Sequence, residues 1–80
     1  MNNMEIELIT FGKIVDFLPA QKIMLEDIPD TDGLKLYLEK SYPQLKTMKY
    51  KLALDQQMVQ SNAQLKNNAR IAIMPPFSGG

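Results

Sequence analysis

The last ten residues of the chain carry the residue types and spacing that point to chemistry. An apolar run from Ile71 to Met74 is followed by two prolines, an aromatic residue, a serine and two glycines: Pro75, Pro76, Phe77, Ser78, Gly79 and Gly80. Because proline cannot donate to a sheet ladder, we expect a strand to end at Met74 and a thin tail to follow it. Such a tail can enter a narrow cleft of a partner and present one group there. We expect that group to be the terminal carboxyl of Gly80.

The terminal carboxyl needs an activating partner before it can react. A free carboxyl group is ionised at neutral pH and is then a poor electrophile. A partner that attaches a leaving group removes this obstacle. Gly80 lacks a Cβ, which lets enzyme groups approach its carbonyl carbon closely, and Gly79 keeps the approach slim.

The other tail residues suit insertion into a partner. Pro75 and Pro76 favour an extended polyproline course, which reduces the ordering entropy lost on insertion. From Met74 to the terminus an extended chain spans up to about 20 Å. We expect Phe77 to fill a pocket of the partner and fix the register of the terminus; the alternative is an exposed aromatic side chain without a role. Ser78 is small and can donate a hydrogen bond.

Composition excludes several classes of function. Of 80 residues, 45% are hydrophobic and 22% are charged, which is typical of one small globular domain. Nine basic and nine acidic residues cancel, so nucleic acid is not an expected partner. Histidine and cysteine are both absent, which removes disulfides, the usual zinc ligands, thiol nucleophiles and the usual general base. We therefore expect no metal site and no catalysis by this chain alone.

The same sequence gives no sign of membrane targeting. Residues 1–8 carry Glu5 and Glu7 without Lys or Arg, unlike a signal peptide. No apolar run approaches the roughly 20 residues that span a bilayer. These features predict a cytoplasmic location.

Alternating residues predict the first strand, and they place two large apolar side chains on its outer face. Residues 4–8 alternate apolar and acidic side chains, so the apolar ones should face the core. The same alternation puts Ile9 and Phe11 on the outer face. Either the strand is covered by a loop or bent at Gly12, or these residues form a contact surface for a partner.

A second strand is expected at residues 21–27, followed by a helix. Asp30 is the expected N-cap of this helix, because its carboxylate can accept from free backbone N–H groups. Pro43 disfavours helical geometry at the preceding residue, so the helix should end near Ser41. Helical spacing defines an expected core-facing stripe of Leu34, Tyr37, Leu38, Ser41 and Leu45.

The rest of the chain predicts further strands. Residues 49–59 read as a strand, a turn at 55–57 and a return strand. Residues 62–68 are polar and rich in turn formers, with Leu65 as their anchor. The last strand is expected at residues 71–74.

Two strands, a helix and two or three further strands are the order of a β-grasp domain. The predicted fold class is therefore α+β: a ubiquitin-like β-grasp with a mixed four- to five-stranded sheet packed on one main helix. We expect the domain to occupy residues 1–76 and a flexible Gly-Gly tail to occupy residues 77–80.

The last ten residues resemble the ending of the MoaD family, the small subunits of molybdopterin synthase, which are ubiquitin-like sulfur carriers. That family typically closes with a hydrophobic strand, Pro-Pro, an apolar residue, a small residue and Gly-Gly. Thr10-Phe11-Gly12 matches the aromatic and small residues near the end of its first strand, and residues 30–38 lie where its helix begins. The element order agrees over the whole length.

The chain also departs from the family pattern. The family often has Arg-Glu or Arg-Asp after the first strand, and soon afterwards a glycine; here Val15-Asp16 and Pro19 stand instead. Before the last strand the family favours Asp-Gly-Asp-Glu, whereas this chain has Asn67-Asn68-Ala69-Arg70. The turn can still form, since Asn tolerates left-handed geometry. The family's polar contacts to partners are therefore not carried over.

The resemblance implies a cycle of partners. A MoeB-like adenylyltransferase uses ATP and magnesium to adenylate the terminal glycine, although the carrier itself binds no cofactor. A sulfur donor system, such as a cysteine desulfurase, converts the adenylate to a thiocarboxylate. The carrier then docks into the large, MoaE-like catalytic subunit, which transfers sulfur to cyclic pyranopterin monophosphate. Two carriers on a dimer of large subunits give a heterotetramer.

The resemblance also implies a docking patch beside the tail. In the family an apolar patch at this position packs against the large subunit, and Phe11, Met58 and Met74 occupy matching positions. The alternative is that they are ordinary core residues. Methionine suits a surface that meets two partners, because its flexible side chain can repack.

Three other functions remain open at this point. The related ThiS-like carrier for thiamine thiazole synthesis shares the fold and the Gly-Gly end, but usually lacks Pro-Pro before the tail. A ubiquitin-like modifier would form isopeptide bonds to lysines. A plain binding module would have an inert tail.

Overall fold

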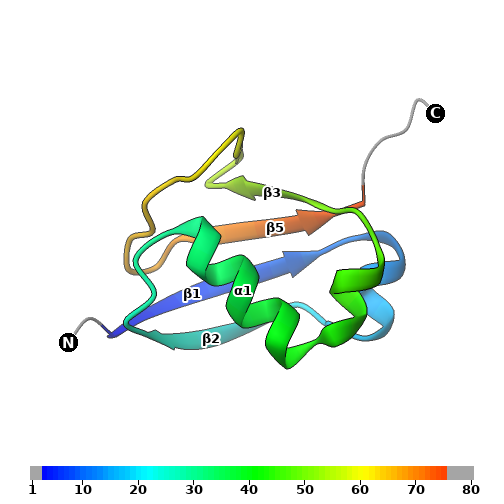
Figure 1. Cartoon of the computed structure of the whole chain (residues 1–80). Coiled ribbons are helices and arrows are strands. Elements are labelled where there is room, and N and C mark those ends of the chain that lie inside the picture. Colours follow the sequence, from blue (N-terminus) through cyan, green and yellow to red (C-terminus); the bar gives the residue numbers. More distant parts are fainter. Residues whose placement is uncertain (1–2, 76–80) are drawn as a thin grey trace.

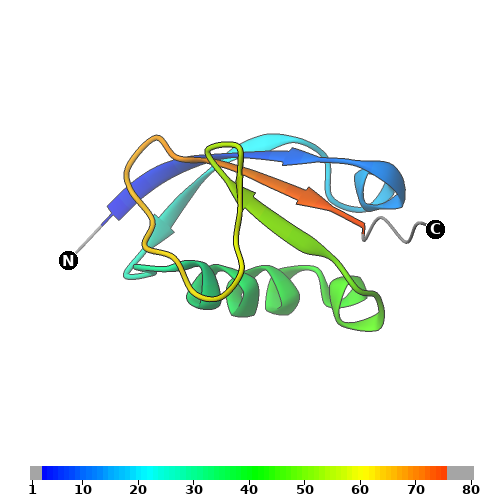
Figure 2. The same cartoon turned by 90° about the horizontal axis from the view of Figure 1, so that it is seen from above.

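The computed structural model describes residues 3–75 of the chain. One main helix, α1 (Thr31–Ser41), lies across one face of a five-stranded mixed sheet, as Figure 1 shows from the helix side and Figure 2 from above. The strand order is β2-β1-β5-β3-β4, with β1 and β5 parallel and the other pairs antiparallel. The strands are β1 (Asn3–Thr10), β2 (Gln21–Glu26), β3 (Lys51–Leu54), β4 (Gln57–Met58) and β5 (Arg70–Met74). The predicted β-grasp fold is confirmed.

The core lies between the sheet and α1. As expected from the alternation in β1, Ile6 and Leu8 are fully buried. From α1, Leu34 and Leu38 are fully buried against them. Burying side chains of this size contributes about 1.5–3 kcal/mol each, which makes this layer the main stabilising element of the domain.

Part of the predicted helical stripe is wrong. Tyr37 is 38% exposed and Ser41 lies in water, so α1 buries a narrower stripe than the spacing indicated. Leu45 is buried, but it belongs to a separate 3₁₀ helix, η2 (Pro43–Thr47). Pro43 explains the break, because it has no N–H to donate and restricts the residue before it. The predicted end of α1 at Ser41 is confirmed.

The first turn of α1 is held by hydrogen bonds to a residue just before the helix and to a segment much later in the chain. The Asp30 carboxylate accepts from the Gly33 N–H at 2.9 Å, which confirms Asp30 as the N-cap. The Asn62 side chain donates to the other Asp30 oxygen at 3.0 Å, and its own carbonyl accepts from the Asp32 N–H at 2.9 Å. The Thr31 N–H donates to the Ala63 carbonyl at 2.8 Å. The hydrogen bond from Asn62, followed by that from Gly33, lowers the pKa of Asp30.

Within residues 3–75, four non-glycine residues adopt positive φ, and three of them shape turns before β4 and β5. Asp55 and Gln56 have φ of 48° and 73° and form the two-residue connection between β3 and β4. The predicted turn is therefore one residue shorter, because Gln57 already pairs with Leu54. Asn68 has φ of 67°, the left-handed geometry expected of that turn.

Like η2, a second 3₁₀ helix was not predicted. The segment after β1 forms a short 3₁₀ helix, η1 (Gly12–Asp16), which buries Ile14. Leu18, just beyond it, is also fully buried. Both side chains belong to the core cluster, and the figures place η1 beside the end of β5.

Candidate functional site

The tail begins at a firmly held point in the sheet. β5 lies between β1 and β3 and is paired with both of them. It ends at Met74, as predicted, and Pro75 is half-buried directly after it. The expected tail residues lie outside the described part of the chain: Pro76, Phe77, Ser78, Gly79 and Gly80.

Gly12 makes a close approach to the first residue of the tail. Its φ is +62°, in the left-handed region that side chains with a Cβ rarely adopt. A Cβ at Gly12 would lie 3.0 Å from Pro75 Cγ and 3.4 Å from Pro75 Cδ. The absence of a side chain here therefore lets the turn after β1 lie directly against Pro75.

The predicted patch residues lie together on the sheet face opposite α1. The Phe11 N–H donates to the Ile73 carbonyl at 3.1 Å, which sets Phe11 beside Met74 at the end of the parallel pair β1–β5. Phe11 is 49% exposed, and Met74 is half-buried. Met58 on β4 is 44% exposed and is separated from β5 by one strand, β3. Phe11 and Met58 are therefore surface residues, and the alternative that they belong to the core does not hold.

The strand register adds three residues that link these side chains. Ile9 pairs with Ala72, Ala72 pairs with Ala53, and Ala53 pairs with Met58 in one row across β1, β5, β3 and β4. The outward side of the strands alternates with the core side, so this row shares the face of Met74. We call the whole set the outer patch: Ile9, Phe11, Ala53, Met58, Ala72 and Met74.

Sequence reasoning found only half of the outer patch. The alternation in the first strand predicts that Ile9 faces outward, but it does not assign Ile9 or the two alanines to the patch. Ala53 is 6% exposed although it lies outside the main core cluster. The alternation of residues in β3 and β5 places both alanines on the outer face. A single sequence does not show how these strands pair, so it does not show that the alanines lie beside Ile9 and Met58.

Charged groups border the outer patch. Two register positions from the pair Ile9–Ala72, on the same face of β1 and β5, Arg70 Nε lies 3.2 Å from Glu7 Oε1. Exposed pairs of this kind contribute about 0–1 kcal/mol, so this one defines a polar edge more than it stabilises the fold. Lys51 pairs with Met74 at the end of the sheet near the tail and is exposed. The outer patch is thus apolar at its centre and charged at its rim, the usual anatomy of a protein interface.

No group of three or more acidic side chains within residues 3–75 is placed to hold a metal ion. No helix in the same range has the length and apolar character needed to cross a bilayer. The arrangement places the apolar outer patch beside the last residues of β5.

The single main helix and the order of the strands define a ubiquitin-like β-grasp domain. A sequence model of the ThiS family matches residues 7–80. The chain belongs to the ThiS family, whose ubiquitin-fold members serve as sulfur carriers and small modifiers. The resemblance predicted from the tail is confirmed at this broader level.

Two solved structures are similar to the chain over nearly its whole length. The solution structure of the HVO 2177 protein from Haloferax volcanii matches with a TM-score of 0.79 and 17% identity, covering 98% of this chain and 88% of that one. The solution structure of small archaeal modifier protein 1 (SAMP1) from Methanosarcina acetivorans matches with a TM-score of 0.74 and 18% identity, covering 100% of both chains. At these identities the likeness establishes the fold alone.

Proposed function

We propose that this protein is the sulfur carrier subunit of a molybdopterin synthase, working in the cytoplasm. Membership of the ThiS family supports the carrier role, and the Pro-Pro before Phe77 favours the MoaD type within it. The observation that carries the proposal is the outer patch, which adjoins the last residues of β5. A partner that covers this patch receives the tail at the edge of the same contact.

The proposed reaction takes place on the carboxyl group of Gly80. An adenylyltransferase joins this carboxylate to the adenylyl group of ATP and releases pyrophosphate, with magnesium bound to the nucleotide. A persulfide of the donor system attacks the adenylate and displaces AMP, and a second thiol of the donor then cleaves the resulting acyl disulfide, which leaves a thiocarboxylate on Gly80 and a disulfide on the donor. The large catalytic subunit accepts the tail and passes the sulfur to cyclic pyranopterin monophosphate. No step requires an acid, base or metal ligand from the carrier, which has no histidine or cysteine.

The deciding experiment is mass spectrometry after incubation with a cognate activating enzyme, MgATP and a sulfur donor. We expect a mass gain equal to the exchange of one oxygen for one sulfur. Deleting Gly80 should abolish this gain, because the new terminal carboxyl, on Gly79, falls one residue short of the activating site, while circular dichroism and thermal unfolding stay unchanged. Persistent molybdopterin synthesis with the truncated chain would show that the tail assignment is wrong.

A second candidate is a protein modifier, which the structural likeness to SAMP1 favours. A modifier uses the same activated carboxyl group but transfers it to a lysine amine, forming an isopeptide bond and releasing AMP or a thiol. Ladders of higher-mass conjugates, lost when Gly80 is deleted, would support this role. A third candidate is the thiazole carrier. The sulfur acceptor distinguishes it from the proposed function, because its sulfur would pass to a thiazole synthase instead of the large subunit of molybdopterin synthase.

A further inference from the structure

One edge of the sheet is only partly covered. β4 pairs with β3 solely at Ala53 and Leu54, and beyond Met58 the chain leaves the sheet toward α1. Asn62 then binds the first turn of α1 through the Asp32 N–H. Within residues 3–75, no strand lies beside Tyr50 and the start of β3 on the side away from β5.

The open edge presents backbone hydrogen-bonding groups. The Val59 N–H donates to the Leu52 carbonyl at 2.9 Å, so Leu52 points its backbone groups away from β5. In an extended chain, residues two apart point these groups to the same edge. Tyr50 therefore presents its N–H and C=O to the same open edge. A peptide strand added at this open edge of β3 continues the ladder of backbone hydrogen bonds that stops at Val59.

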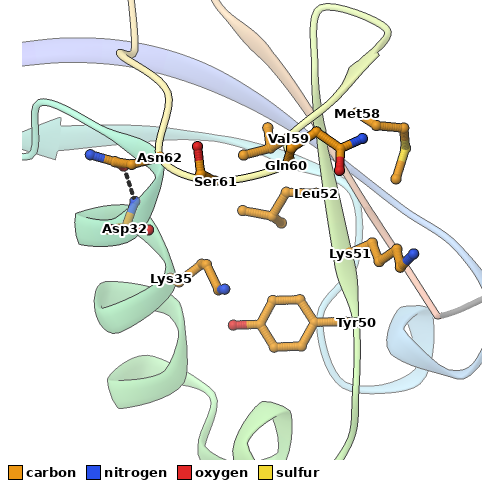
Figure 3. A pocket seen from close by; sticks show the side chains of 10 residues that line it. All are labelled: Asp32, Lys35, Tyr50, Lys51, Leu52, Met58, Val59, Gln60, Ser61 and Asn62. Atoms are coloured by element: carbon orange, nitrogen blue, oxygen red, sulfur yellow. Dashed lines mark hydrogen bonds between the residues drawn. The ribbon is translucent and has the colours of Figure 1, made fainter.

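A hollow lies against this edge. It has a volume of about 590 Å³ and is bounded by α1, by the start of β3 and by the segment 59–62 (Figure 3). A neighbouring hollow of about 360 Å³ shares Lys35, Tyr50 and Lys51 and continues toward Lys49. We call the two together the β3 groove. Its combined size is within the range of sites that hold a short peptide segment or a small ligand.

The walls of the groove combine an aromatic surface with cations. Lys35 extends from α1 toward Tyr50, and its Nζ lies 5.8 Å from the centre of the Tyr50 ring (Figure 3). The Tyr50 hydroxyl donates to Glu39 Oε2 at 2.6 Å, so one of the two acids at the groove already has a partner. Burial, together with this carboxylate, raises the pKa of Tyr50, which keeps the phenol protonated as the donor. The other acid is Asp32.

The charges of the two sheet edges differ. Three lysines border the β3 groove, against the two acids: Lys35, Lys49 and Lys51. The Lys51 side chain points away from Lys35 and Tyr50, toward the face of the outer patch (Figure 3). At the opposite edge, β2 carries one lysine and one glutamate, Lys22 and Glu26, and the adjoining β1 adds Glu5, while Glu7 is paired with Arg70. A chain segment with carboxylates is therefore attracted to the β3 edge and disfavoured at the β2 edge.

We propose that the β3 groove binds an extended, acidic peptide segment of a partner protein, which adds a strand beside Tyr50, Lys51 and Leu52. Main-chain hydrogen bonds to the open edge supply affinity, and alternate side chains of the peptide meet Tyr50 and Lys35. This site does not depend on the tail or on sulfur chemistry. It gives the domain a second means of engaging a partner, with Met58 at the boundary between the groove and the outer patch.

The test is an NMR titration of the ¹⁵N-labelled full chain with a synthetic probe peptide. The probe carries four alternating valines and isoleucines followed by four aspartates, and a matched probe carries asparagines in place of the aspartates. We expect the amide signals of Tyr50, Lys51 and Leu52 to shift with the acidic probe and far less with the neutral one. Lys35→Glu should weaken binding about fivefold or more, consistent with the loss and reversal of one exposed charge. Lys22→Glu, a control at the other edge, should leave the affinity unchanged.

Three outcomes would overturn the proposal: no shifts at millimolar probe, shifts confined to β2 or to the outer patch, or equal binding of the two probes. A chain lacking Gly79 and Gly80 should bind the acidic probe as well as the full chain does. This variant separates the groove from the proposed carrier function, because loss of thiocarboxylate formation leaves the groove result intact. Unchanged ¹⁵N spectra away from the groove verify that Lys35→Glu is folded.

Discussion

At the scale of single residues, Gly12 controls how the chain leaves the sheet. We expect Gly12→Ala to lower the free energy of unfolding by about 1–3 kcal/mol, because the left-handed backbone is strained and the new Cβ meets Pro75. It should also slow thiocarboxylate formation by displacing Pro75 from its place beside the turn. Urea denaturation and the mass-gain assay measure the two effects. Val15→Ala, at an exposed position of η1, is the matched control; an equal loss in both variants would assign the effect to η1 in general.

Thr10 presents a second test at this scale. It is 8% exposed, and its Oγ1 has no hydrogen-bond partner among residues 3–75. An unpaired buried hydroxyl costs free energy, so Thr10→Val should leave stability unchanged or raise it by about 1 kcal/mol. Thermal unfolding measures the result, with Thr31→Val as a contrast. Thr31 Oγ1 accepts from the Ala63 N–H at 3.0 Å, and its loss should destabilise the protein.

At the scale of elements, the start of α1 depends on a charged cap. The pKa of Asp30 is lowered, so its ionised form stabilises the fold above the unfolded-state pKa. That contribution disappears as pH falls through the folded-state pKa. We therefore expect Asp30→Asn to be less stable than the parent at pH 7, and the difference to vanish in acid. Urea denaturation at several pH values checks this; a difference that persists when the carboxyl is protonated would assign the role to packing.

The elements also show which parts of the fold could be predicted from the sequence. The alternation of residues 4–8, the Asp30 cap and the break at Pro43 are local signals, and the structure confirms the prediction from each. η1 was missed because a single turn of 3₁₀ helix is too short to display a period, and its two anchors, Ile14 and Leu18, resemble scattered loop residues. The outer patch was half found, because joining Ile9 to the alanines requires the pairing of strands distant in sequence.

At the scale of the whole molecule, recognition and chemistry are separated along the chain. We expect Phe11→Asp to weaken binding to the large subunit at least tenfold, because it places a charge in the apolar centre of the outer patch. Adenylation should suffer less if the activating enzyme uses a different face. Calorimetric titration measures the affinity, and Lys22→Ala, away from the patch, is the control. Unaltered affinity for the Phe11 variant would move the docking surface elsewhere.

The parallel pairing of β1 with β5 has a mechanical consequence. The two strands are neighbours in the sheet. β1 is the first strand of the chain and β5 is the last. Tension applied between the termini therefore loads their ladder lengthwise, and several hydrogen bonds must break at once instead of one by one. A partner that grips and draws the terminal segment pulls against the strongest direction of the sheet, so the domain stays intact while its end is handled.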